Sequence, residues 1–208
     1  MSPQSKSAET YTAQKIDVLE GLEAVRKRPA MYIGSTGVQG LHHLVYEVVD
    51  NSVDEALAGH CDLVKVCIYE DGSCSVEDNG RGIPVDIHPS YNVPAAELVL
   101  TTLHAGGKFN NDNYQVSGGL HGVGVSCVNA LAEWLELDVW RGGFHYRQRF
   151  SRGAKVTALE KIGPTEKRGT RVRFLPDEDI FIETICFSSS VLTRRLHRLK
   201  AIEEPVKL

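Results

Sequence analysis

The feature that most constrains this 208-residue chain is a long stretch with helical periodicity at residues 41–58. Gly59 follows it, at the position where a glycine commonly ends a helix. The apolar residues recur every three or four positions, so they form one face of an α-helix that must be buried against another element. They are Leu41, Leu44, Val45, Val48, Val49, Val53, Ala56 and Leu57.

Most of the strand signals lie in the second half of the chain. One hairpin comes early, at 63–69 and 74–76 around the turn signal Asp71-Gly72. Later alternating patterns predict strands at 134–140, 144–150, 155–162 and 170–175. Further helices are predicted at 16–28, 95–104, 125–132 and 189–200, with a glycine-rich loop at 34–40. Because neighbouring strands form hairpins without a strict βαβ alternation, we predict an α+β fold. It is a two-layer sandwich with helices on one face of a mixed, mostly antiparallel sheet.

The length fits one large domain. We expect an N-terminal arm at 1–14, a single domain at 15–200 and a C-terminal tail at 201–208. The polar N-terminus lacks the apolar segment of a signal peptide, and the sequence has no apolar run near the ~20 residues that span a bilayer. We therefore expect a cytoplasmic protein with no membrane partner.

Composition excludes some classes of function. The net charge is −4, from 23 basic and 27 acidic residues, so the overall charge does not predict a grip on DNA. The five cysteines form no C-x-x-C pair, which argues against a disulfide framework or a zinc site. We expect buried or inert thiols in a reducing compartment at Cys61, Cys67, Cys74, Cys127 and Cys186.

The polar face of the long helix is the first candidate for chemistry. A helical wheel groups five side chains opposite the apolar face: Glu47, Asp50, Asn51, Asp54 and Glu55. A solvated face explains such a set in most amphipathic helices. The alternative is a site, because Glu47 and Asn51 lie one turn apart. A carboxylate can take a proton from water, and an amide oxygen can hold Mg²⁺.

A second candidate, Glu-Asp-Asn-Gly-Arg-Gly-Ile-Pro at 77–84, directly follows a predicted strand. Because Asp, Asn and Gly are turn formers, a surface turn is the simple interpretation. The functional interpretation is that the two glycines let the backbone approach a flat ligand. Asp78 would then accept a hydrogen bond from an exocyclic amine such as that of adenine.

Glycine is concentrated again at 105–109 and 117–124. Glycines before a helix let several backbone N–H groups point at one anion, and long glycine-rich loops can also be lids. A flexible linker is the alternative, which the Val, Leu and Phe residues in this segment disfavour. The spacing matches neither a P-loop, because Phe109 follows Lys108, nor the G-x-G-x-x-G dinucleotide motif.

The order of these motifs resembles the GHKL ATPases, which share the Bergerat fold and include gyrase B, Hsp90, MutL and histidine kinases. Within them the chain looks like the bacterial type II DNA topoisomerase branch, from about Tyr11 to Phe174. The resemblance favours the gyrase B group, with the corresponding ATPase protein of topoisomerase IV as the alternative. The segments that carry it lie at 26–34, 41–43, 47–56, 103–109 and 117–124.

The resemblance implies an ATPase that uses ATP and Mg²⁺. Glu47 would be the general base that activates the attacking water, and His43 would help to orient that water. Asn51 would be the Mg²⁺ ligand. This division of labour makes physical sense, because phosphoryl transfer to water depends mostly on positioning and on charge neutralisation.

Nucleotide binding is also implied by the resemblance. Asp78 would accept from the adenine amino group with help from Thr170, and Gly82 would let adenine sit close. The other residues implied to bind the nucleotide are Ile83, Lys108, Tyr114, Leu120, His121, Gly122, Val123 and Gly124.

Partners follow from the same resemblance. Tyr11 and Ile16 would belong to an arm that reaches a second copy of the chain when ATP binds. The full enzyme would be an A2B2 complex with gyrase A that contacts DNA through other parts. Aminocoumarin-type inhibitors would bind a pocket formed by Asp78, Arg81, Gly82, Pro84, Arg141 and Thr170.

The sequence departs from the family pattern in places. Gln115 stands where gyrase B often has lysine, and Ala30 replaces a frequent glycine. Residues 200–208 do not resemble the usual continuation, which an artificial origin would explain. The family's next domain, the transducer, supplies a lysine to the γ-phosphate. Without it, we expect this fragment to bind ATP and to hydrolyse it poorly.

The predicted role is to power negative supercoiling of DNA through nucleotide-gated dimerisation. The equivalent role in topoisomerase IV, decatenation, stays open as an alternative. A second hypothesis is a dimerisation clamp in which hydrolysis is incidental. A third, a chaperone or mismatch-repair relative, is disfavoured by the sequence His-Ala-Gly-Gly-Lys-Phe at 104–109.

Overall fold

The computed structural model describes residues 21–103, 105 and 124–202 of the chain. The predicted arm at 1–14 and most of the predicted tail lie outside these residues. In chain order the elements are α1 (Gly21–Lys27), α2 (Ala30–Ile33), α3 (Val38–Leu57), β1 (Val64–Ile68), β2 (Cys74–Asp78), α4 (Ala95–Thr101), α5 (Gly124–Ala130), β3 (Ala132–Arg141), β4 (Phe144–Ser151), β5 (Ala154–Lys155), β6 (Glu160–Pro164), β7 (Gly169–Pro176) and α6 (Ser189–Ile202).

The strands form one seven-stranded sheet in the order β1-β2-β7-β3-β4-β5, with β6 paired to β4. All the strand pairings within it are antiparallel, so the parallel component that a mixed sheet implies is not found in the described residues. The late strand β7 enters between β2 and β3, where Val172 is opposite both Val76 and Leu137. This insertion joins the early hairpin to the later strands in one sheet.

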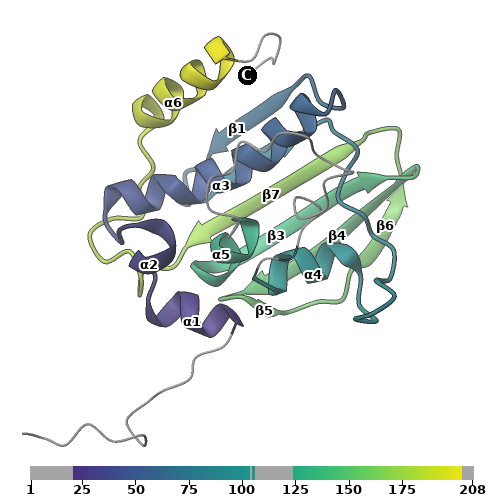
Figure 1. The fold of residues 1–208 in the computed structure, drawn as a ribbon, viewed down its shortest axis with the longest axis horizontal. Coiled ribbons are helices and arrows are strands. Elements are labelled where there is room, and N and C mark those ends of the chain that lie inside the picture. Colours follow the sequence, from purple (N-terminus) through teal and green to yellow (C-terminus); the bar gives the residue numbers. More distant parts are fainter. Residues whose placement is uncertain (1–20, 104, 106–123, 203–208) are drawn as a thin grey trace, which may run out of the picture.

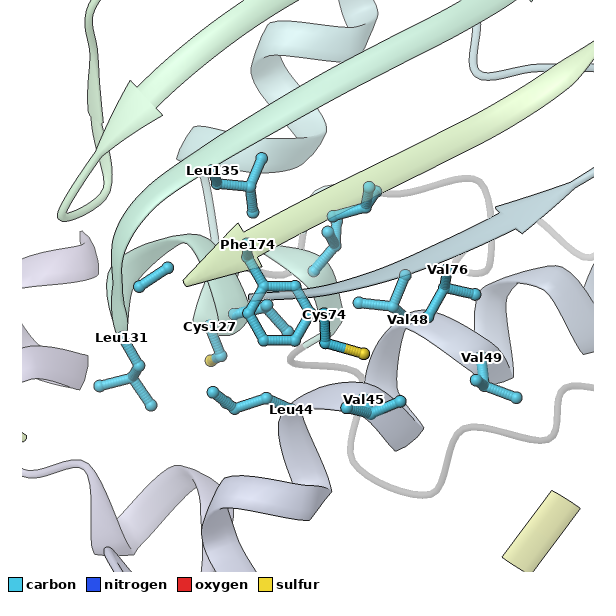
Figure 2. Packing of buried hydrophobic residues seen from close by; sticks show 14 of the residues in the cluster. Leu44, Val45, Val48, Val49, Cys74, Val76, Cys127, Leu131, Leu135 and Phe174 are labelled. Carbon is cyan, nitrogen blue, oxygen red and sulfur yellow. The ribbon is translucent and has the colours of Figure 1, made fainter. Parts of the chain in front are cut away.

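Helices α3, α4 and α5 cover one face of this sheet (Figure 1), which confirms the α+β two-layer prediction. Side chains alternate between the faces of a strand, so every second residue of the central strands enters the core. Figure 2 shows Phe174 of β7 near Leu44 of α3, Cys74 of β2 and Cys127 of α5. All four side chains have no solvent exposure. The core therefore fixes α3 against the centre of the sheet.

Helix α3 begins earlier than predicted. It starts at Val38, so the predicted loop at 34–40 is wrong for its last three residues. A Cβ on Gly40 would lie 1.6 Å from the backbone oxygen of Ser35. Gly40 therefore allows the preceding loop to fold back onto the first turn of the helix. At the other end, Leu57 is 44% exposed, so it does not belong to the buried face as predicted.

The polar side of α3 is not uniformly solvated. Glu47 is 7% exposed and Asp54 is 1% exposed, whereas Asp50, Asn51 and Glu55 are partly exposed. The helix contacts α2 and α5 as well as the sheet, so it is covered on more than one side. A wheel drawn from the sequence does not contain this second layer of contacts.

One further prediction of secondary structure is wrong. The strand expected at 155–162 is divided into β5 and β6. The chain bends between them, because the N–H groups of Val156 and Thr157 both donate to the Arg149 carbonyl, at 2.9 and 3.3 Å. Helix α2 lies directly after Pro29, in a segment for which no element was predicted.

The structure also shows the exposure of the cysteines and the character of the helices. Cys61, Cys74 and Cys127 are buried, and Cys67 and Cys186 are exposed. Within the described ranges, the helices do not combine the length and apolar character needed to cross a membrane.

Candidate functional site

The candidate site lies where the end of β2, the start of β7 and the polar side of α3 meet. Asp78, the last residue of β2, is 8% exposed. Its Oδ1 accepts from the backbone N–H groups of Gly80 (2.9 Å) and Thr170 (3.2 Å). Its Oδ2 accepts from the Ser52 hydroxyl on α3 at 3.1 Å. Three separate segments thus hold one carboxylate.

The charge of Asp78 is only partly compensated. Burial raises its pKa above the ordinary range, and the hydrogen bonds from Gly80, Ser52 and Thr170 oppose that rise without cancelling it. These donors are neutral, so they orient the carboxylate without neutralising its charge. A buried carboxylate of this kind is suited to a ligand that brings its own hydrogen-bond donors.

Two glycines let the backbones close in around Asp78. Gly169 has φ +121°, and a Cβ there would lie 1.9 Å from the Asp78 carbonyl oxygen. Gly82 has φ +74°, and a Cβ there would lie 3.0 Å from the carbonyl oxygens of Gly169 and Trp140. Both positions favour glycine by conformation, and Gly169 also by space. The close approach places Thr170 beside the turn, where its Oγ1 accepts from the Ile83 N–H at 3.2 Å.

Two arginines and a glutamate form the rim of the candidate site, at the edge of the turn that follows Asp78. The Arg81 guanidinium donates to both carboxylate oxygens of Glu55 on α3, at 2.8 and 3.1 Å, and the Arg81 N–H donates to Glu55 at 3.0 Å. Arg141, at the end of β3, donates to the carbonyl oxygens of Arg81 and Gly82 at 3.1 and 2.8 Å. The 77–84 turn is therefore tied to α3 on one side and to β3 on the other, with Pro84 exposed.

Helix α3 supplies an acid–base pair. His43 Nε2 lies 3.0 Å from Glu47 Oε1, one turn along the helix. The Glu47 side chain is 8% exposed and that of His43 is 27% exposed. Asn51 follows after a further turn and is partly exposed. A buried carboxylate held by a histidine has the geometry of a proton acceptor for a bound water.

The donor set fits magnesium and not a metal held by protein alone. Among the described residues, no group of three His, Cys, Asp or Glu side chains is arranged to hold a metal ion. Mg²⁺ commonly keeps waters and binds through one or two protein oxygens plus the phosphates of a substrate. The Asn51 amide oxygen is a hard ligand of this type, so the site fits a magnesium ion that arrives with a nucleotide.

The structure brings many of the predicted residues together. Asp78, Gly82, Ile83 and Thr170 form one hydrogen-bonded unit, bordered by Arg81 and Arg141. Gly124 starts α5 with φ +48°. Eight predicted residues lie outside the described part of the chain: Tyr11, Ile16, Lys108, Tyr114, Leu120, His121, Gly122 and Val123.

Sequence reasoning missed three contributions to the site. Ser52 was not singled out, although a hydroxyl residue on a valine-rich helix stretch is a usable signal. Gly169 directly precedes the strand predicted at 170–175, but its contact with Asp78 joins residues 91 positions apart, which sequence spacing cannot predict. The ion pair of Glu55 with Arg81 likewise joins residues whose proximity only the fold determines.

Comparisons with known proteins show the family of this chain. A family model described as "Histidine kinase-, DNA gyrase B-, and HSP90-like ATPase" matches residues 36–180. The DNA gyrase B protein of Thermotoga maritima is 62% identical over 200 residues, which cover 96% of this chain and 31% of that protein. The DNA gyrase B protein of Treponema pallidum is 58% identical over 196 residues, covering 94% of this chain and 31% of that protein.

A solved structure is similar in fold. The crystal structure of the 43K ATPase domain of Thermus thermophilus gyrase B, in complex with an aminocoumarin, matches with a TM-score of 0.76 and 48% sequence identity. The match covers 86% of this chain and 44% of that chain. This chain thus spans under a third of the length of the two curated relatives and under half of the solved domain.

Proposed function

We propose that this chain, which belongs to the histidine kinase-, DNA gyrase B-, and HSP90-like ATPase family, is the ATP-binding and ATP-hydrolysing domain of a DNA gyrase B protein. The single observation that carries the proposal is the buried Asp78, held by neutral donors beside Gly82 and Thr170. The curated relatives named above are gyrases, which favours gyrase over topoisomerase IV.

Adenine recognition is the role of the Asp78 unit. The carboxylate accepts a hydrogen bond from the exocyclic amine of adenine, and burial makes that bond strong because water does not compete. Gly82 leaves room for the flat base, and Thr170 assists at its edge. The raised pKa of Asp78 fits this role, because the three donors of the protein do not fully offset its burial and adenine brings a further donor.

Hydrolysis is the role of the polar side of α3. Glu47 accepts a proton from the attacking water, and His43 holds Glu47 and orients the water through the 3.0 Å contact. Asn51 would hold Mg²⁺, which would supply positive charge to the phosphate oxygens. Lys108 and the backbone from Leu120 to Gly124 complete the phosphate site.

For the whole protein we propose the activity of a DNA gyrase, the name that the relatives carry. The longer protein dimerises through the arm at Tyr11 and Ile16 when ATP binds. It also joins gyrase A in an A2B2 complex and powers negative supercoiling of DNA. Light scattering of the full-length protein with and without a non-hydrolysable ATP analogue tests the dimerisation step. An unchanged mass would contradict it.

Inhibitor binding is a second property carried over from a relative. The solved gyrase B domain holds an aminocoumarin. In this chain the rim formed by Arg81, Pro84 and Arg141 next to Asp78 is where we place such an inhibitor. Competition between an aminocoumarin and ATP in calorimetry tests the placement, and additive binding would contradict it.

The experiment that tests the proposed function is ATP turnover by the full-length protein with Glu47→Gln. We expect turnover to fall by about 10²- to 10⁴-fold, because the general base is lost, while ATP binding persists. Glu70→Gln, at an exposed glutamate in the β1–β2 turn, is the matched control and keeps turnover. Unchanged turnover in a folded Glu47→Gln variant would overturn the assigned role.

A further inference from the structure

His42 and His43 are neighbours in the sequence with different surroundings. His43 is partly exposed and contacts Glu47, whereas His42 is 1% exposed. The Nδ1 atom of His42 lies 2.7 Å from the Val38 carbonyl oxygen, and its Nε2 lies 2.9 Å from the backbone nitrogen of Ser188. Both ring nitrogens of this buried histidine are therefore engaged by the backbone.

The two contacts fix the state of the ring. Because the Ser188 N–H can only donate, His42 Nε2 must accept, and the proton of the neutral imidazole resides on Nδ1. Nδ1 then donates to Val38 within α3. Ser188 directly precedes α6, and its carbonyl accepts from the Leu192 N–H at 3.1 Å. His42 thus links the beginning of α6 to the first turns of α3.

Aromatic packing reinforces this link. Phe187 places its ring edge-on to His42, with centroids 5.9 Å apart, and edge-on to Phe174 of the core at 6.0 Å. One turn further along α3, the Arg195 guanidinium of α6 lies 5.6 Å from the centroid of the Tyr46 ring. Tyr46 also packs edge-on to His43 at 6.5 Å. Helix α6 and the residue before it therefore contact Tyr46 and His42, and these flank the turn that carries His43 and Glu47.

We infer that His42 is a positioning residue for hydrolysis. Through its bond to the Ser188 N–H, it holds the His43–Glu47 turn at one orientation relative to α6. The position of α6 therefore sets the geometry of the base. This inference rests on the proposed ATPase function. Displacement of a catalytic group by about 1 Å can cost on the order of 100-fold in rate, so a small shift of this turn has a large effect. Asp78 is held by Ser52, ten positions further along α3, and by the backbone of Gly80 and Thr170, so we expect ATP affinity not to depend on the link at His42.

The test uses two variants of the full-length protein that each retain one of the two His42 contacts. His42→Gln keeps an acceptor near the Nε2 position and so keeps the bond to Ser188. His42→Asn keeps a donor near the Nδ1 position and loses Ser188. We expect His42→Asn to lower kcat by about 10- to 100-fold with ATP affinity unchanged, and His42→Gln to retain most of the turnover. Equal kcat in the two variants, or a parallel loss of ATP affinity, would overturn the inference.

A second pair of variants changes Ser188, the other partner of the hydrogen bond. It tests the inference even if a His42 variant does not fold. Ser188→Pro removes the donating N–H, whereas Ser188→Ala keeps it and serves as the control. We expect a lower kcat in the proline variant only. Equal kcat in both refutes the link. Wild type and Glu47→Gln are measured in the same series. If kcat is the same in wild type and Glu47→Gln, the proposed function is contradicted. If Glu47→Gln lowers kcat but His42→Asn does not, only the role of His42 is contradicted.

Discussion

Two buried aspartates of the same sheet have opposite electrostatics. Asp78 faces the helices at the end of β2, and Asp138 of β3 faces the other side, because its neighbours Leu137 and Val139 enter the core. Asp138 has no solvent exposure. It accepts from His145 at 2.6 Å, from Arg147 at 2.8 Å and from two nitrogens of Arg171.

The direction of the pKa shift follows from the donors. Burial alone would raise the pKa of Asp138, but the hydrogen bonds from His145, Arg147 and Arg171 outweigh it and lower the pKa. At Asp78 burial prevails, because its donors are a hydroxyl and two backbone N–H groups. At Asp138 the protein compensates the negative charge with cationic side chains, whereas at Asp78 it supplies neutral donors only and leaves the carboxylate able to accept a further hydrogen bond from a ligand.

The largest expected effect that tests this contrast is on stability. Asp138→Asn removes the buried anion that two arginines and a histidine share, so we expect a loss of about 3–5 kcal/mol in the free energy of unfolding. Urea denaturation at pH 7 measures it. A loss under about 1 kcal/mol would show that the charge of Asp138 does not stabilise the sheet.

The same substitution at Asp78 separates binding from stability. We expect Asp78→Asn to weaken ATP binding by about 1.5–3 kcal/mol, because a charged acceptor is replaced by a neutral amide. The free energy of unfolding at pH 7 should be unchanged or higher, since the variant avoids burying a charge. Calorimetry with ATP and Mg²⁺ measures the first effect and urea denaturation the second. Equal ATP affinity in both proteins would show that the adenine anchor is wrongly placed.

Asp78 and Asp138 should change the stability of the protein with pH in opposite directions. The lowered pKa of Asp138 adds stability that is present above the unfolded-state value, about pH 4, and is lost as the pH falls through the lower folded-state pKa. The raised pKa of Asp78 removes stability as the pH rises above about 4. Unfolding curves of wild type, Asp78→Asn and Asp138→Asn, recorded from roughly pH 2 to pH 8, measure the contribution of each aspartate to stability. Parallel curves for the two variants would contradict the assignment.

The sequence could predict the parts of the fold that depend on local periodicity. The apolar stripe of α3, the Asp71-Gly72 turn and most of the strands were visible because a helix or hairpin is determined by residues close in the chain. The motif at 77–84 itself predicted Asp78 and its two glycines as a ligand site, and the resemblance to a known family added Thr170; the fold brings these residues together.

The parts that depend on distant contacts could not be predicted. Glu47 and Asp54 on the polar side of α3 are buried by the surrounding fold, which a helical wheel does not contain. The insertion of β7 between β2 and β3 creates the contact of Gly169 with Asp78. The clustering of His145, Arg147 and Arg171 around Asp138 needs the register of three strands, which single-strand patterns do not fix.

The smallest expected effect is on ATP binding, when the one hydroxyl that donates to Asp78 is removed. Ser52→Ala removes the donor to Asp78 Oδ2 and leaves the two backbone donors to Oδ1 in place. We expect ATP binding to weaken by about 0.5–1.5 kcal/mol, because the carboxylate loses the contact that orients its second oxygen. Ser73→Ala is the matched control. Its hydroxyl donates to the Asp71 carboxylate in the β1–β2 turn, away from the site, so ATP affinity should stay at the wild-type value. Calorimetry on both variants measures the difference, and equal affinities would mean that neutral donors do not organise Asp78 for its ligand.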